Sequence, residues 1–201
     1  MRTKARSLAL AAVAGCAAAL APGTGLAGRV ELDARVFPAV NAIAGRAVTI
    51  RCTAVETGQF EALGHADFKR RRITLQPSLC RRINELVAAP AAGGTPAAGA
   101  QARALLVLAH EAVHLSSYAG RTNEALTECR AIQLVATTAR ALGVDAATAS
   151  ALGHEALRFD ALLPGPGDWL VGLGEVPSYH SPDCYDGGPL DIHPDSSDWP
   201  N

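Results

Sequence analysis

Two long stretches without glycine or proline, joined by a short turn, constrain the fold more than any other feature of this sequence. The first runs from about residue 100 to 117, and the second runs from about 123 to 142 and stops at Gly143. Each is long enough for about five helical turns, and a glycine just past the last turn is a common helix stop. A turn this short, around Ala119 and Gly120, makes two helices antiparallel neighbours. The sequence therefore predicts a helical hairpin, followed by a third helix over about 146–162.

The residues before the hairpin contain shorter, β-rich runs bounded by turn residues, which predict strands. Three strands are expected, at residues 47–52, 66–68 and 71–75. Pro77 opens a predicted helix through about residue 87, and the Gly- and Pro-rich segment 89–99 predicts a flexible loop. Residues 28–45 fit either a short helix or an extended lead-in. A small sheet followed by packed helices is an α+β fold.

The composition is that of one compact domain with tails. Hydrophobic residues make up 49% of the chain and charged residues 18%, which excludes a disordered polyampholyte. The formal net charge of −1 gives no electrostatic basis for binding nucleic acid. We expect a single domain at 28–163 and an irregular acidic segment at 164–201 that packs on it.

The first 27 residues have the pattern of an export signal: basic residues, a short apolar run and then small residues. The apolar run is too short for a permanent anchor, and no later stretch reaches the length of a transmembrane helix. Two processing sites for this signal are compatible with the sequence. Cleavage after Ala27 gives a secreted chain, whereas the lipobox-like residues before Cys16 would leave that cysteine acylated on a membrane.

Four cysteines remain after such processing: Cys52, Cys80, Cys129 and Cys184. An even number in an exported protein predicts two disulfides, with three possible connectivities. The chain contains no CxxC pair, which disfavours a cysteine zinc cluster.

The first helix of the hairpin carries the pattern HExxH at positions 110–114. Positions i and i+4 lie on one helix face, so the imidazoles of His110 and His114 can bind a single Zn²⁺. Glu111 lies about 100° round the helix, where its carboxylate can take a proton from water and return it to a leaving amine. The opposite face carries an apolar stripe suited to burial, made of Leu105, Leu108, Ala112 and Leu115.

Two carboxylates, Glu124 and Glu128, begin the second helix and are expected to face the histidine pair. A catalytic zinc takes three protein ligands and keeps one position for water, and two histidines with one glutamate are a standard set. The remaining carboxylate can accept the free N–H of a liganding imidazole. If no metal were bound, two carboxylates would be buried without a cation, which is unfavourable.

HExxH followed by a helix that starts N-E-x-x-[ST]-[DE] resembles the gluzincin branch of zinc metallopeptidases, the thermolysin-like families. The likeness covers residues 101–139. It implies that His110, His114 and Glu124 are zinc ligands and that Glu111 is the general base. It also implies that Glu128 orients His110, and that strand 73–75 is the edge strand with which an extended substrate pairs. The run 184–191 is similar to uncharacterised exported bacterial HExxH proteins.

The chain departs from that family in two ways. The linker between the histidines and Glu124 is shorter than in thermolysin. No thermolysin-like C-terminal domain follows, so Tyr118, Tyr179 and His180 are candidates for transition-state groups by residue type only. The extension typical of metzincins is absent, because Ser117 and Gly120 stand where that motif has glycine and histidine.

These patterns predict an exported, zinc-dependent hydrolase, most simply a small metallopeptidase acting on a peptide or protein. The alternative is a non-catalytic envelope protein with a zincin-like fold that binds a metal or a partner. The presence of Glu111 argues for the enzyme, because a structural zinc site needs no base and closes its fourth position with another ligand.

Overall fold

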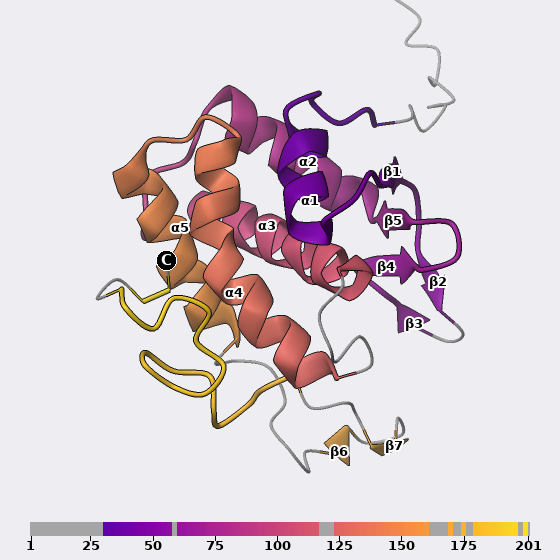
Figure 1. Cartoon of the computed structure of the whole chain (residues 1–201). Helices are drawn as coiled ribbons and strands as arrows, with labels where there is room; N and C mark the ends of the chain where they lie inside the picture. The colour runs from indigo at the N-terminus through magenta and orange to yellow at the C-terminus, as the bar shows by residue number, and fades with distance from the viewer. Residues whose placement is uncertain are drawn as a thin grey trace, which may run out of the picture.

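The computed structural model describes residues 30–57, 60–116, 123–160, 169–170, 174–175, 179–196 and 199–200. The predicted export signal, with Cys16, lies outside the described residues, as does the turn around Ala119 and Gly120. The predicted α+β class is confirmed: a small sheet lies on one side of a group of five helices (Figure 1).

The helices are α1 (Val36–Ala44), α2 (Pro77–Ala88), α3 (Pro96–Leu115), α4 (Glu124–Ala141) and α5 (Ala146–Asp160). The longer strands are β1 (Thr49–Cys52), β4 (Gly64–Asp67) and β5 (Arg72–Leu75). Two antiparallel pairs of two-residue strands are also present: β2 (Glu56–Thr57) pairs with β3 (Phe60–Glu61), and β6 (Trp169–Leu170) pairs with β7 (Gly174–Glu175) in the C-terminal segment.

Helix α3 begins earlier than the sequence predicts, so the expectation of a loop through residue 99 is wrong. Thr95 caps the helix, with its hydroxyl oxygen accepting a hydrogen bond from the N–H of Ala98 at 3.1 Å. Pro96 then occupies the first helical position, where its missing N–H does no harm. A good cap and N-terminal proline outweigh the unfavourable helix propensity of Gly99. Of the two structures expected for segment 28–45, the described residues contain the short helix, α1, over Val36–Ala44, and Gly45 caps it in a left-handed conformation (φ 67°).

The three-stranded sheet has the order β1-β5-β4, with β5 parallel to β1 and antiparallel to β4. Strand β5 is therefore central, and the expectation that residues 73–75 form a substrate-pairing edge is wrong. Ile73 and Leu75 are both fully buried, as expected for a central strand. The edge strand that packs against α3 is β4.

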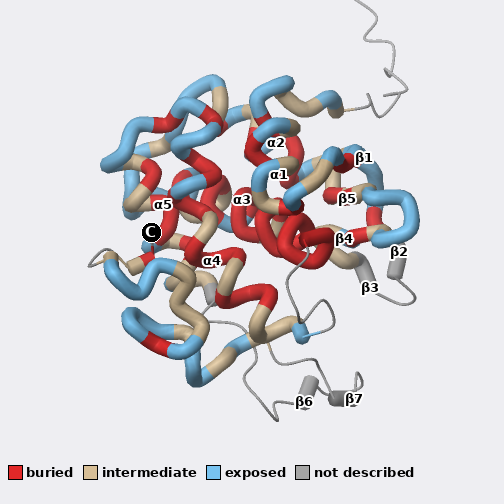
Figure 2. The backbone as a smooth tube through the Cα atoms, viewed as in Figure 1, coloured by how far each residue is buried: buried red, intermediate tan, exposed pale blue. Residues whose placement is uncertain are grey.

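Helix α3 runs through the middle of the molecule (Figure 1) and packs against α1, α2, α4, α5, β4 and β5. Its apolar stripe is buried, and most of its other side chains are buried as well (Figure 2). Because small alanines surround it, the neighbouring helices can approach α3 from several sides. The buried side chains of this helix are therefore held by packing from several sides.

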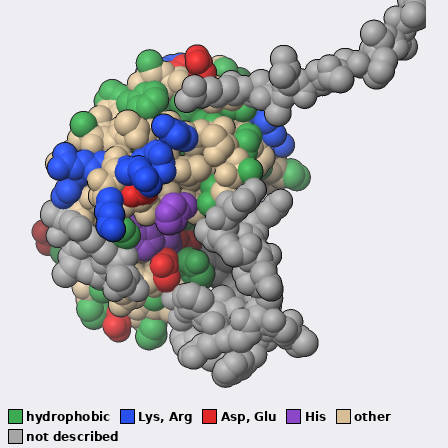
Figure 3. All heavy atoms as spheres, turned by 90° about the vertical axis from the view of Figure 1, so that its right-hand side faces the viewer, with side chains coloured by type: hydrophobic (Ala, Val, Ile, Leu, Met, Phe, Trp, Pro, Cys, Tyr) green, Lys and Arg blue, Asp and Glu red, His purple; other side chains and the backbone are tan. Residues whose placement is uncertain are grey.

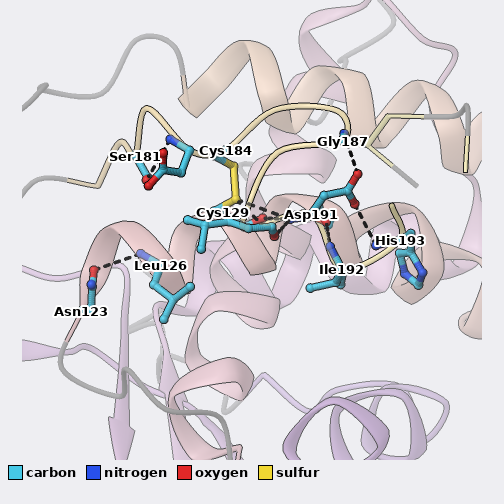
Figure 4. Close-up of a disulfide and its surroundings, with 12 residues drawn as sticks. Asn123, Leu126, Cys129, Ser181, Cys184, Gly187, Asp191, Ile192 and His193 are labelled. Atoms are coloured by element: carbon cyan, nitrogen blue, oxygen red, sulfur yellow. Dashed lines mark hydrogen bonds between the residues drawn. A yellow bond between two sulfur atoms is a disulfide. The ribbon is translucent and has the colours of Figure 1, made fainter. Parts of the chain in front are cut away.

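Two disulfides are present, as predicted, and they settle the connectivity. Cys52 pairs with Cys80, which joins β1 to α2, and Cys129 pairs with Cys184, which joins α4 to the C-terminal segment (Figure 4). Buried Gln133 supports the second link, since its amide donates to the carbonyl of Leu190 at 3.0 Å and accepts from the N–H of Ile192 at 2.7 Å. Two disulfides indicate an oxidising, extracytoplasmic environment. None of the described helices is long and apolar enough to span a membrane.

Candidate metal centre

The two histidines of α3 lie on one helix face, one turn apart, and their Nε2 atoms are 3.0 Å from each other. Both side chains are buried. The imidazole rings are nearly perpendicular, with centroids 4.6 Å apart. The spacing of the two histidines along the helix thus brings two nitrogen donors to one point, as the HExxH pattern predicts.

Glu124 brings a third donor from the neighbouring helix. Asn123 caps α4, with its side-chain oxygen accepting the N–H of Leu126 at 3.1 Å (Figure 4), so Glu124 becomes the first residue of the helix. The Oε2 atom of Glu124 lies 3.1 Å from Nε2 of His110 and 3.2 Å from Nε2 of His114. Within the described part of the chain, these three side chains are the one group of His, Cys, Asp or Glu whose ligand atoms converge closely enough to hold a metal ion.

The donor set and its dimensions fit zinc. Tetrahedral zinc with bonds of about 2.0–2.1 Å to nitrogen and oxygen separates its ligands by about 3.3 Å. The three observed separations, 3.0, 3.1 and 3.2 Å, are close to that value. Neutral imidazole nitrogens and one carboxylate oxygen are also the ligand types of catalytic zinc sites.

Glu128 lies behind this group. Nδ1 of His110 donates to Oε2 of Glu128 at 2.6 Å, and both side chains are buried. A short hydrogen bond to a carboxylate fixes the orientation of the ring and leaves Nε2 pointing toward His114 and Glu124. Glu124 is thus a donor of the candidate metal centre, whereas Glu128 orients one of its histidines.

The close packing of these charges changes their acidities. Burial alone would lower the pKa of His110, but hydrogen bonds to Glu124 and Glu128 raise this pKa to about 10. Conversely, hydrogen bonds from His110 and His114 hold the pKa of Glu124 at about 2. Glu124 is therefore an anion throughout the physiological range, while a cation at Nε2 of His110 must displace a proton.

Glu111 lies next to the two histidines and is only 8% exposed. Burial raises the pKa of its carboxyl to about 7, against the opposing effect of the neighbouring imidazoles. Strand β4 makes room for it, because a Cβ at Gly64 would lie 2.6 Å from Oε1 of Glu111. Sequence reasoning missed Gly64, since the predicted strand began two residues later and left this glycine in the preceding turn.

Two aromatic residues border the group. The ring of Tyr179 lies 5.9 Å from that of His110, and burial raises the pKa of its phenol to about 12. The ring of Phe68, 46% exposed, meets His114 edge-on at 6.3 Å. Of the other groups proposed by residue type, His180 is exposed and Tyr118 lies outside the described residues. Phe68 was missed because nothing in the local sequence links the end of a strand to His114.

On the side of the molecule that carries the sheet, histidine side chains reach the surface beneath a group of Lys and Arg side chains (Figure 3). The structure thus brings His110, His114, Glu124, Glu128 and Glu111 together.

Comparisons with protein-family models, curated proteins and solved structures found no match to this chain. What the centre does must therefore be inferred from its own side chains.

Proposed function

We propose that this protein is an exported, zinc-dependent metallopeptidase of the gluzincin type. The observation that supports this proposal most strongly is the convergence of His110, His114 and Glu124, with atoms 3.0–3.2 Å apart, beside the buried carboxyl of Glu111. Three ligands leave one coordination position for a reactant. Bound zinc would supply a Lewis acid, which polarises a substrate carbonyl and makes water acidic enough to react at neutral pH.

Glu111 would carry the proton. General acid–base catalysis is most efficient when the pKa of the group lies near the working pH, and burial places the pKa of Glu111 at about 7. The carboxylate can then accept a proton from the attacking water and pass it to the departing amine. A site that only held a metal would not need a further buried carboxyl beside its ligands, because burying a carboxyl is unfavourable.

Strand β4 supports a peptide substrate. It is an edge of the sheet β1-β5-β4, it packs against α3, and its first residue, Gly64, touches Glu111. An edge strand offers backbone N–H and C=O groups to an extended peptide. Tyr179, whose phenol stays protonated with a pKa of about 12, lines the same cavity as Gly64 and Glu111 and can donate a hydrogen bond there.

The proposal is tested with a peptide-library cleavage assay on the mature protein and on Glu111→Gln, with zinc content measured for both. We expect Glu111→Gln to keep its zinc and to lose at least about 100-fold in turnover, the lower end of what an acid–base group supplies. Glu85→Gln, on the exposed face of α2, is the matched control and should keep full activity.

A zinc-loaded wild-type protein that cleaves no peptide would refute the peptidase and favour the alternative, a non-catalytic metal-binding or partner-binding protein of the cell envelope. Full activity in Glu111→Gln would show that another group is the base.

A further inference from the structure

A cavity of about 220 Å³ opens beside His110 and Glu111 and extends back along α3. Its walls are mostly apolar, with Leu106 and Val107 on α3, Leu63 just before β4, and Phe159 on α5. At the end away from the metal ligands lies Arg103. We call this space the Arg103 pocket.

Arg103 differs from the other arginines nearby. Arg82 and Arg158 are paired with carboxylates, at 2.6 Å from Glu85 and 3.2 Å from Glu155. No carboxylate among the described residues lies within ion-pair distance of Arg103; its guanidinium instead lies over the ring of Phe159, with the guanidinium carbon 4.6 Å from the ring centroid. A cation–π contact of this kind positions a guanidinium without neutralising its charge.

The pocket has a definite length. Arg103 precedes His110 by seven residues on the same helix, which corresponds to about 10 Å along the axis at 1.5 Å per residue. An extended peptide advances about 3.3–3.6 Å per residue. A group that reaches Arg103 therefore lies about three residues from a carbonyl held at the metal ligands.

We propose that the Arg103 pocket is a substrate-binding site in which Arg103 binds a carboxylate about three residues from the scissile bond. A guanidinium presents a planar fork of donors that matches a carboxylate, and the apolar walls suit an aliphatic side chain between the two ends. The carboxylate can be the C-terminus of a peptide or the side chain of an aspartate or glutamate. This inference rests on the proposed function, from which it takes a peptide as the substrate. Binding of the carboxylate to Arg103 can nevertheless be measured without turnover.

The test is calorimetric binding to two forms of the protein, zinc-loaded Glu111→Gln and zinc-free wild type. The probes are N-acetylated tetrapeptides of alanine and leucine, as free acids and as C-terminal amides. A second set of amides carries glutamate or, as its matched partner, glutamine at one internal position. We expect one acidic member of these pairs to bind at least about tenfold more tightly than its neutral partner, the effect of a hydrogen bond to a charged group.

In Arg103→Gln that preference should fall to about one, whereas Arg103→Lys should keep part of it because the charge remains but the fork is lost. Arg140→Gln, which removes an equal charge from the exposed face of α4, should keep the whole preference. Dependence on the free C-terminus identifies a carboxypeptidase-like substrate, and dependence on glutamate identifies an acidic side chain.

Equal binding of acids and neutral partners by the wild type would overturn the inference, as would a preference that survives in Arg103→Gln. Cleavage without an Arg103-dependent preference would refute the pocket and leave the peptidase standing. Arg103-dependent binding by a protein that cleaves nothing would refute the peptidase and leave a carboxylate-binding site.

Discussion

Glu124 and Glu128 are the same residue type, four positions apart on one helix, yet the geometry gives them different tasks. Glu124 contributes an oxygen 3.1–3.2 Å from the Nε2 atoms of both imidazoles, whereas Glu128 contacts Nδ1 of His110, at 2.6 Å. Replacing each by alanine should therefore weaken zinc binding by different amounts.

The magnitudes follow from these contacts. Removing the carboxylate that orients a liganding histidine typically lowers metal affinity 10–100-fold, so Glu128→Ala should remain loaded at micromolar zinc. Structural zinc sites bind with about 10 kcal/mol or more, which divided over three protein ligands is about 3–4 kcal/mol each. Glu124→Ala should thus lose at least a few hundredfold in affinity and purify without zinc. Glu128→Gln, which keeps an acceptor for the buried N–H of His110, should lose less than Glu128→Ala.

The assay is a competition titration against a chromophoric zinc chelator, with circular dichroism to confirm that each variant is folded and Glu85→Ala as an exposed control. The reverse order of affinities would make Glu128 the ligand. Equal and small effects would remove both glutamates from the metal centre, and the gluzincin likeness with them.

Three further results are expected. Gly64→Ala should displace Glu111, because Oε1 of Glu111 would lie 2.6 Å from the new methyl group. Turnover should then fall about tenfold or more, with zinc retained. The control is Gly99→Ala, whose methyl group meets open space and should stabilise the fold by up to about 1 kcal/mol without changing turnover. Because the pKa of His110 is raised to about 10, zinc competes with a proton, and its affinity should fall about tenfold per unit as pH is lowered from 9 to 7; a flat profile there would contradict that pKa. Cys184→Ser opens a disulfide that spans 55 residues and should lower unfolding free energy by about 2–4 kcal/mol in a denaturant titration; an unchanged midpoint would show that the link adds no stability.

Much of the centre could be predicted because its determinants are local. The spacing of His110 and His114 follows from the helical period, and the short hairpin makes Glu124 and Glu128 neighbours of that pair. The two disulfides also followed from the even number of cysteines, but their connectivity did not, since Cys52 reaches Cys80 because β1 pairs with β5, the strand that leads into α2.

What escaped prediction depends on contacts between distant segments. Strand β5 is central rather than an edge because β1 pairs with it in parallel, a choice that no local pattern of residues 71–75 encodes. Contacts between α3 and distant segments likewise determine the roles of Gly64, Phe68 and Arg103. Tyr179 reaches His110 from a segment that the Cys129–Cys184 disulfide ties to α4.

The most direct test of the account is anomalous diffraction at the zinc edge from crystals of the mature protein grown with one equivalent of zinc. We predict one strong peak per chain, at about 2.0–2.2 Å from Nε2 of His110, Nε2 of His114 and Oε2 of Glu124. A peak at another position, or none in a well-ordered crystal with these three side chains in place, would contradict the account.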